Sequence, residues 1–262
     1  MTGVGSDGAA GTGRECSHAG LAFGYTGRPV TVVDDAQAIE ALRRCPLFEP
    51  CPDGVLVEVG RRLRLRHFRR NEVVFHQGDP GDALHVITAG AVKIVLPSPE
   101  GEEAIIATLR PGDFFGELAL LDGQPRSATA TAVEPTETLT LPRDVFRELV
   151  DHHPELRDAL FSALTTQLRR LTKHVEELHF LDLAGRLAAR LARLGHEAQP
   201  SGTGPIELDW PYTQSDLAAM IGGTRQSVNR LLAELIDDGL VSLEHERLVV
   251  SDLRALERRA ER

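Results

Sequence analysis

Residues 111–131 read PGDFFGELALLDGQPRSATAT, and this stretch decides the fold. A glycine-rich turn leads into one apolar helical turn that carries Glu117, and Arg126 and Ser127 follow just before a strand-like run. A helix start offers N–H groups and a positive dipole end to an anion, Arg126 offers a two-pronged donor, and Ser127 offers a hydroxyl. Glu117 would repel a phosphate, so we expect it to bind a sugar hydroxyl. These residues predict a pocket for a small phosphate ester of a sugar.

Short strands surround this stretch between Leu63 and Leu141. Apolar residues alternate with polar ones, and turns that contain Gly or Pro separate the runs, as in a sandwich or barrel. The clearest runs are Glu72–His76, Ala83–Thr88, Ala91–Leu96 and Glu103–Leu109. They predict a β-roll of the jelly-roll type, interrupted by one helical insertion, within an α+β protein.

A long helix is predicted to follow the β-roll. After a short helix over 142–150, Pro154 stands at a first-turn position and the helical pattern continues to about Phe180. Five apolar residues alternate spacings of four and three: Leu164, Leu168, Leu171, Val175 and Leu178. This seam predicts a parallel helix pair across a homodimer. The alternative is that the stripe packs on its own β-roll, as we expect for Leu156, Leu160 and Phe161.

The last part of the chain carries the pattern of a winged helix. Asp182 is expected to cap a helix from Leu183 to Leu194 that Gly195 ends. Two short helices capped by Thr213 and Thr224 then flank a Gly-Gly turn, which is the pattern of a helix-turn-helix. A hairpin over 241–250 would form the wing.

Charge placement matters more than net charge for any contact with DNA. The chain has a net charge of −10, and residues 181–262 hold ten Lys or Arg and thirteen Asp or Glu. This balance argues against non-specific coating of nucleic acid. However, no acid occurs from Thr224 through Ala233, where the second helix begins. The local basicity predicts that this helix start enters a DNA groove.

Two motifs resemble one known family. Phe-Gly-Glu-Leu-Ala followed by Pro-Arg-Ser-Ala-Thr closely resembles the phosphate-binding cassette of cyclic-nucleotide-binding domains, especially in the bacterial cyclic-AMP receptor protein/FNR family of transcription regulators. Thr-Gln-Ser-Asp-Leu-Ala, Gly-Gly-Thr-Arg-Gln-Ser-Val-Asn-Arg and Asp-Gly-Leu-Val are similar to the same family. The resemblance covers about residues 39–250, and the occurrence of both motifs in this order is more specific than either alone.

The resemblance implies roles for residues of the ligand pocket. Glu117 would take the ribose 2′-hydroxyl, while Arg126, Ser127 and the backbone amides of Gly116 and Leu118 would hold the cyclic phosphate. On the long helix, Leu171 and Thr172 occupy the positions that contact the base. Leu171 cannot form a hydrogen bond with a base, whereas Thr172 can, so the nucleotide stays open. An alternative is that Glu117 and Arg126 form a structural ion pair in a relative that binds no ligand.

The resemblance also implies a DNA-contacting set at the start of the second helix. Its members are Thr224, Arg225, Gln226, Ser227, Asn229 and Arg230. Arg bonds guanine and Gln bonds adenine in bidentate fashion. The best-known family members have Glu at the Gln226 position, so no half-site sequence is transferred to this chain.

We therefore expect four parts in the chain. These are a disordered extension at 1–34, a β-roll with flanking helices at 35–152, a dimerisation helix at 153–181 and a winged helix-turn-helix at 182–262. The expected function is a cytoplasmic, ligand-responsive transcription regulator, with cyclic AMP the leading effector. It would bind a roughly palindromic duplex as a homodimer. Whether it activates or represses transcription stays open; activation would require a surface for RNA polymerase. The alternative is a member that binds DNA without a cyclic mononucleotide, either constitutively or gated by cyclic di-GMP or by redox change.

Other functional classes find less support in the sequence. An enzyme would need a catalytic constellation, and we identify no nucleophile–base pair and no metal motif, so no metal is expected. No apolar run approaches the roughly 20 residues that span a bilayer. The three cysteines, Cys16, Cys45 and Cys51, are too few for the four thiolates of an iron–sulfur cluster. Structural or redox-labile thiols remain the interpretation of these residues.

Overall fold

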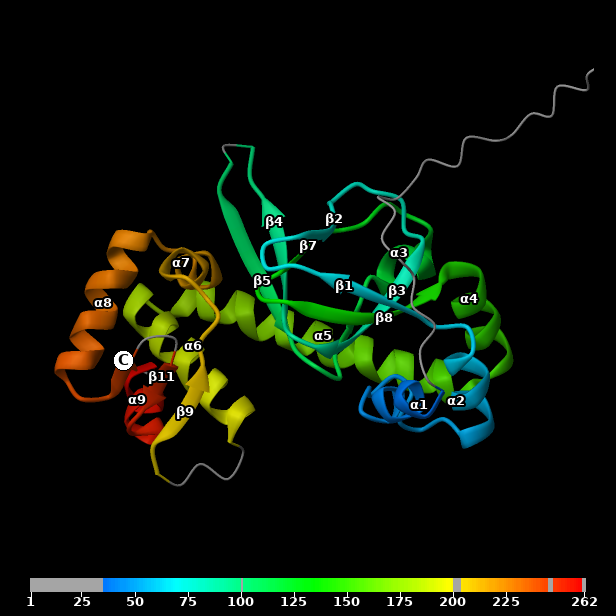
Figure 1. The fold of residues 1–262 in the computed structure, drawn as a ribbon. Coiled ribbons are helices and arrows are strands. Elements are labelled where there is room, and N and C mark those ends of the chain that lie inside the picture. Colours follow the sequence, from blue (N-terminus) through cyan, green and yellow to red (C-terminus); the bar gives the residue numbers. More distant parts are fainter. Residues whose placement is uncertain (1–34, 100, 200–203, 245–246, 261–262) are drawn as a thin grey trace, which may run out of the picture.

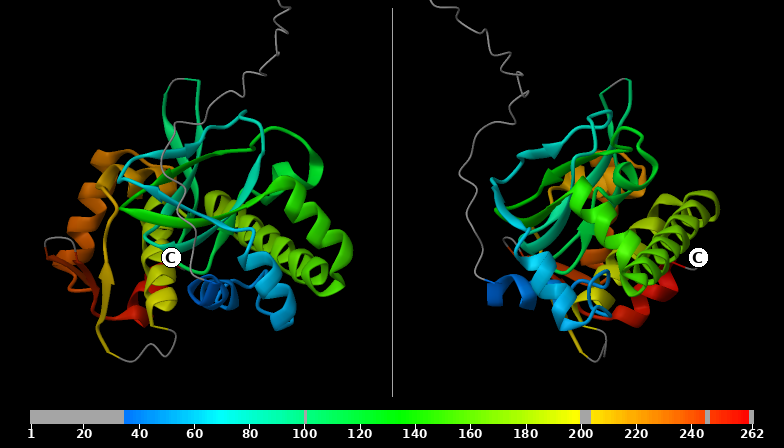
Figure 2. Two further views of the ribbon diagram at one scale, coloured as in Figure 1. Left: turned by 45° about the vertical axis from the view of Figure 1, so that its right-hand side comes forward. Right: turned by 90° about the vertical axis from the view of Figure 1, so that its right-hand side faces the viewer.

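The computed structural model describes residues 35–99, 101–199, 204–244 and 247–260, so the extension expected at 1–34 lies outside it. The β-roll lies between a group of helices at one end and the C-terminal domain at the other (Figure 1). Helix α5 (Pro154–Phe180) runs along the β-roll and connects the two ends. Figure 2 shows that α5 lies on one side of the β-roll rather than beneath its centre.

Two antiparallel four-stranded sheets form the β-roll. One has the order β1-β8-β3-β6 and the other the order β2-β7-β4-β5. The strands of the first are β1 (Arg64–Phe68), β8 (Thr136–Pro142), β3 (Ala83–Ala89) and β6 (Phe114–Phe115); those of the second are β2 (Val73–Phe75), β7 (Thr129–Ala132), β4 (Val92–Pro97) and β5 (Glu103–Leu109). The β-roll with one helical insertion, α3 (Glu117–Asp122), is confirmed.

His85 lies between the two sheets as a neutral core residue. Its ring stacks on Phe115 with centroids 4.9 Å apart, and its Nδ1 lies 3.2 Å from the Thr138 hydroxyl. Burial, aided by the charges of Arg126 and Arg66, lowers the pKa of His85 to about 3. A protonated imidazole is therefore excluded here at neutral pH, which is consistent with a structural role.

Helices α1 (Asp35–Arg43), α2 (Asp53–Gly60) and α4 (Arg143–His152) close one end of the β-roll. Their shared core includes Phe48 and Phe146 and extends to Leu156 and Leu160 of α5. Cys45 and Cys51 are buried there as free thiols, and burial raises their pKa values to about 12 and about 11. Such thiols are unreactive. Cys16 lies outside the described residues.

Helix α5 begins at Pro154 as predicted, and its apolar seam faces solvent. Leu168, Leu171, Val175 and Leu178 are 64%, 45%, 53% and 42% exposed, and Leu164 is half-buried. A row of large apolar side chains left exposed in one chain favours the helix pair over packing on the β-roll. Phe161 was predicted to pack on the β-roll, and this is wrong, because it is 61% exposed.

Helix α6 (Leu183–Ala198) is longer than predicted, because it continues through Gly195 instead of ending there. A Cβ at Gly195 would lie 2.9 Å from Leu253 Cδ1. Glycine thus permits close packing of α6 against α9 (Leu253–Ala260), a helix that the sequence pattern did not predict. Asp252 caps α9, since its carboxylate accepts from the Ala255 N–H at 2.9 Å.

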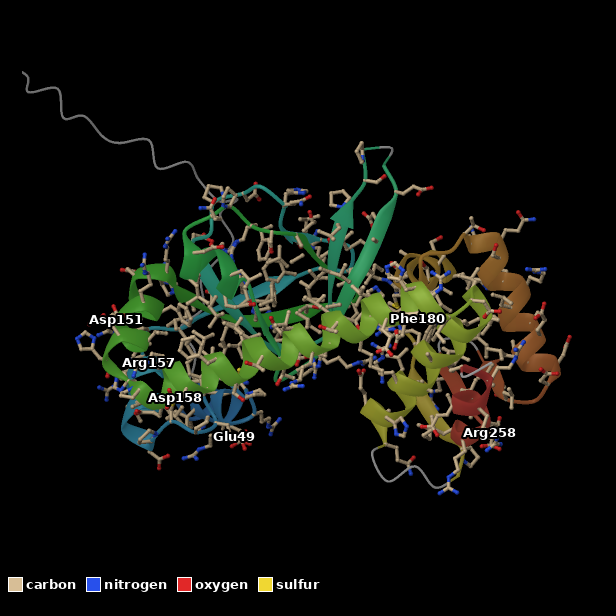
Figure 3. The ribbon with its side chains drawn as sticks, turned by 180° about the vertical axis from the view of Figure 1, so that it is seen from behind. Glu49, Asp151, Arg157, Asp158, Phe180 and Arg258 are labelled. Atoms are coloured by element: carbon tan, nitrogen blue, oxygen red, sulfur yellow. The ribbon has the colours of Figure 1, made fainter. Side chains whose placement is uncertain are left out.

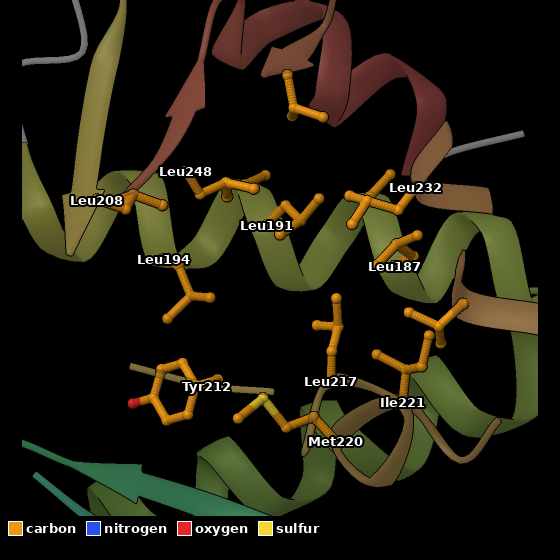
Figure 4. Close-up of a cluster of buried hydrophobic side chains, with 14 of the residues drawn as sticks. Leu187, Leu191, Leu194, Leu208, Tyr212, Leu217, Met220, Ile221, Leu232 and Leu248 are labelled. Carbon is orange, nitrogen blue, oxygen red and sulfur yellow. The ribbon is translucent and has the colours of Figure 1, made fainter. Parts of the chain in front are cut away.

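The rest of the C-terminal domain is a winged helix. Helices α7 (Gln214–Ile221) and α8 (Arg225–Asp237) have the predicted caps, with a full capping box between Thr213 and Asp216. Strands β10 (Val241–Glu244) and β11 (Arg247–Val250) form the wing, and β11 also pairs with β9 (Ile206–Asp209). Figure 4 shows the shared core, in which leucines of α6 face Leu217 and Ile221 of α7.

The winged helix packs directly on the β-roll. Lys93 of β4 contacts Asp216 of α7 at 2.7 Å, and both side chains are largely buried. Burial opposes the charge of Lys93, but the contacts with Asp216 outweigh it and raise the pKa of Lys93. Val95 and Ile105 of the β-roll belong to the same apolar cluster as the C-terminal core. The position of α7 is therefore coupled to that of strands β4 and β5.

The exposed seam predicts a dimer that two charges should disrupt. We expect the Leu168→Glu/Val175→Glu protein to dimerise at least about 100-fold more weakly, because each buried apolar side chain contributes about 1.5 to 3 kcal/mol. Sedimentation equilibrium measures this change. Leu96→Glu is the matched control, since Leu96 is also exposed but lies on β4. A monomeric natural chain, or a double variant that dimerises like it, would contradict the prediction.

Candidate functional site

Arg126 connects three segments at the helical insertion of the β-roll. Its guanidinium donates to the Gly116 carbonyl at 2.7 Å, the Ala83 carbonyl at 2.9 Å and the Asp82 carboxylate at 3.0 Å. The guanidinium also lies 4.2 Å from the centre of the Phe75 ring. The side chain is 1% exposed. Contacts with other protein groups therefore fix its position.

Gly116 is required where β6 meets α3. Its φ is +87°, and a Cβ at this position would lie 2.5 Å from a guanidinium nitrogen of Arg126. Only glycine combines this backbone conformation with such a close approach. The turn places the Glu117 side chain toward the protein interior, where it is 4% exposed.

Glu117 joins the insertion to the long helix. Burial raises the pKa of Glu117, while hydrogen bonds from its own backbone N–H and from Gln167 of α5, and the charge of Arg126, oppose the rise. The carboxylate that Arg126 contacts is that of Asp82 rather than that of Glu117. This geometry does not favour a structural Glu117–Arg126 pair, and it leaves Glu117 linked to α5.

Ser127 is exposed, in contrast to the buried Arg126 that precedes it. Its backbone carbonyl accepts from Gln77 Nε2 at 3.2 Å, and the backbone of Arg126 pairs with Gly78 and Asp79. These bonds fix the loop before β7, so the Ser127 hydroxyl is available at the edge of the site.

A cavity of about 580 Å³ joins these residues to α5. Gly116, Glu117, Leu118, Arg126 and Ser127 all line it, together with Gln167 and Leu171 of α5. The volume lies within the usual range for small-molecule pockets. From behind, α5 passes in front of both the β-roll and the C-terminal domain, and Phe180 marks its end beside that domain (Figure 3). One cavity thus contacts the insertion, the long helix and the second domain.

The two residues predicted for the base differ in their placement. Leu171 lines the cavity and also belongs to the exposed seam, so the cavity borders the face expected to meet a second copy. Thr172 is exposed, does not line the cavity of its own chain, and donates to the Leu168 carbonyl at 3.0 Å. A contact between Thr172 and a ligand would have to cross the helix pair.

Sequence reasoning missed Asp82 and Gln167. Both act through partners that are distant in sequence, Arg126 and Glu117, so no local motif marked them. The spacing of Gln167 from Leu171 by one helical turn could have placed both on the same face of α5.

The start of α8 forms an exposed polar surface. The Thr224 hydroxyl accepts from the Ser227 N–H at 3.2 Å and fixes the first turn. Arg225, Gln226, Asn229 and Arg230 are exposed, whereas Val228 and Leu231 of the same helix are buried. The fold therefore brings the predicted DNA-contacting set to one face and orients it outward.

In the part of the chain that the structure describes, no cluster of His, Cys, Asp and Glu side chains has a geometry suited to a metal ion. No described helix is long and apolar enough to cross a membrane.

Comparisons with known proteins match both parts of the chain. Residues 65–153 match the cyclic nucleotide-binding domain family, and residues 185–259 match the Crp-like helix-turn-helix domain family. The CRP-like cAMP-activated global transcriptional regulator of Mycobacterium tuberculosis (strain CDC 1551 / Oshkosh) is 32% identical over 221 residues, 84% of this chain and 99% of the relative.

Solved structures agree with this assignment. A transcriptional regulator of the CRP family from Thermus thermophilus has a TM-score of 0.63 and 27% identity, covering 75% of this chain and 97% of that one. The c-di-GMP responsive global regulator CLP of Xanthomonas campestris shares the fold, with a TM-score of 0.62 and 23% identity. The match covers 72% of this chain and 94% of that one. The chain belongs to the CRP/FNR family and combines a cyclic nucleotide-binding domain with a Crp-like helix-turn-helix domain.

Proposed function

We propose that this protein is a cytoplasmic, homodimeric transcription regulator, not an enzyme, in which a cyclic nucleotide in the β-roll controls DNA binding by α8. The observation that carries the proposal is the single cavity that joins Glu117, Arg126 and Ser127 to α5 and the C-terminal domain. Cyclic AMP is the leading effector, because the 32% identical mycobacterial relative is named as cAMP-activated.

The site has the chemistry for a cyclic phosphate and a ribose. The backbone amides of Gly116 and Leu118, the exposed Ser127 hydroxyl and the fixed Arg126 guanidinium would hold the phosphate. Glu117 would accept from the ribose 2′-hydroxyl, in place of or together with its bond from Gln167. Leu171, with Thr172 of a second copy, would contact the base.

Ligand binding would reach the DNA-binding domain through α5. A nucleotide that alters the Glu117–Gln167 contact changes the position of α5, which ends at Phe180 immediately before the short connection to α6. In this conformation Lys93 and Asp216 hold α7 against the β-roll. A ligand that favours another position of α5 would shift the population toward a different placement of both α8 helices.

The α8 helices of a dimer would read two half-sites of a roughly palindromic duplex, about 34 to 36 Å apart in successive major grooves. Exposed Arg225 and Gln226 would contact bases, and Arg230 a phosphate or a base. Activation of transcription, as opposed to repression, would in addition require a surface that contacts RNA polymerase.

A second candidate is a family member gated by another ligand, and the apolar Leu171 at the base end of the cavity favours it. Cyclic di-GMP is such a ligand, because the structurally similar CLP is named as c-di-GMP responsive. Gating by redox change has less support, because the thiols of Cys45 and Cys51 are buried with raised pKa values.

The pocket predicts specific losses of nucleotide binding. We expect Ser127→Ala to bind cyclic AMP about tenfold more weakly, because it removes one hydrogen bond to a charged group. Arg126→Ala should bind cyclic AMP at least about 100-fold more weakly. Titration calorimetry on the full-length protein measures both changes.

Arg62→Ala is the control, because Arg62 is partly exposed and pairs with Glu148 outside the cavity. Circular dichroism checks that Arg126→Ala still folds. Absence of heat with every cyclic mononucleotide, or unchanged affinity in both cassette variants, would refute the proposed effector class.

The exposed start of α8 predicts which substitutions weaken DNA binding. We expect Arg225→Ala to bind a selected promoter fragment about tenfold or more weakly, because a bidentate base contact contributes about 1 to 3 kcal/mol. Arg254→Ala on α9 should bind normally, since its side chain is exposed outside α8. Fluorescence anisotropy across a salt series measures both, and affinity should fall steeply with salt. A DNA affinity that changes neither with salt concentration nor in the Arg225→Ala variant would count against this interface.

A further inference from the structure

The end of the cavity farthest along α5 from the cassette is lined by arginines. Arg186, Arg190 and Arg193 of α6 lie on its wall, with Glu177 of α5 and Glu197 of α6 as acidic residues beside them. None of these residues belongs to the cassette that is assigned to the cyclic nucleotide. We call this part of the cavity the arginine end.

Two of these arginines form no ion pair with any described residue. The Arg193 guanidinium donates to the carboxylate of Glu177, with donor–acceptor distances of 2.5 and 2.6 Å. Arg190 donates to the Thr108 hydroxyl at 2.7 Å and Arg186 to the Ile221 carbonyl at 2.8 Å. Among the described residues no carboxylate lies at ion-pair distance from either, and the Nε of each is buried without a hydrogen-bond partner. Glu197 and Glu177 act on Arg190 only at longer range, so an anion against the unsatisfied donors of these two half-buried residues would be stabilised.

The charges at the arginine end of the cavity also affect the pKa values of His174 and Arg190. Burial lowers the pKa of His174 on α5, Glu177 opposes this effect, and the charges of Arg193, Arg190 and Arg186 lower it further. Burial also lowers the pKa of Arg190; the charge of Glu197 opposes this effect, that of Arg193 adds to it, and that of Glu177 opposes it. His174 lines the same cavity, so the three guanidinium groups and the two carboxylates all act on this end of it.

We propose that the arginine end binds a phosphate group, with Arg190 and Arg186 as its principal ligands. A planar guanidinium presents paired N–H donors that match phosphate oxygens. The phosphate would be either a second phosphate of a ligand that also fills the cassette, such as a cyclic dinucleotide, or part of a separate phosphate compound. The proposal does not depend on the cassette binding a cyclic mononucleotide.

The test titrates full-length protein with inorganic pyrophosphate at an ionic strength held constant with chloride. The background variant is Ser127→Glu, because a carboxylate at this exposed position repels phosphate from the cassette. We expect pyrophosphate to bind Ser127→Glu, and to bind Ser127→Glu/Arg190→Gln at least about tenfold more weakly.

Two matched variants separate the anion site from a purely structural role of Arg190. Thr108→Val removes the hydrogen bond of Arg190 but keeps its charge, so it should retain pyrophosphate binding in the same background. Arg258→Gln, at a residue of α9 away from the cavity, should also retain it (Figure 3). Failure of pyrophosphate to bind Ser127→Glu, or equal binding with and without Arg190, would overturn the proposal.

Two nucleotide titrations identify the source of the phosphate. If one ligand spans the cavity, cyclic di-GMP binding weakens at least about tenfold in Ser127→Glu and in Arg190→Gln alike. If two separate compounds occupy the cassette and the arginine end, cyclic AMP binding weakens only in Ser127→Glu. Pyrophosphate then still binds the natural chain saturated with cyclic AMP. Absence of cyclic AMP binding in the natural chain would refute the proposed effector without affecting the pyrophosphate result.

Discussion

The buried guanidinium of Arg126 is the contact on which the arrangement of the cavity depends. It donates to Gly116 at the start of α3, to Ala83 of β3 and to the carboxylate of Asp82. These segments are far apart in sequence, and a buried charge tolerates only a well-satisfied environment. Because Gly116 lies against Arg126, the direction of Glu117 follows from the same contact. Contacts within the protein thus define the geometry of the cassette.

The position of α5 links this cassette to the rest of the molecule. Glu117 meets Gln167 on one side of the helix, while Leu168 and Val175 are exposed for a second copy. The same helix ends where the winged helix begins, and that domain contacts the β-roll through Lys93 and Asp216. A change at any of these contacts therefore bears on the others, and this is the physical basis that we propose for coupling ligand, dimer and DNA.

The sequence predicted what local patterns encode, and it missed what depends on tertiary contacts. Alternating strands, the Pro154 helix start and the Thr213 and Thr224 caps are local, and the structure confirms them. Gly195 was misjudged because its reason is the closeness of Leu253, and Phe161 because one apolar residue beside a stripe does not reveal which face is buried. Asp82, Gln167 and the arginine end required the fold, since their partners come from other elements.

If the cavity controls the DNA-binding helices, the DNA affinity of one protein sample must differ with and without cyclic AMP. Fluorescence anisotropy on a duplex selected from a random pool gives both values at one salt concentration. We expect saturating cyclic AMP to change the DNA affinity at least about fivefold, and DNA to change the cyclic AMP affinity by the same factor. Equal DNA affinity in the two samples, although cyclic AMP is bound, would contradict control of these helices by the cavity.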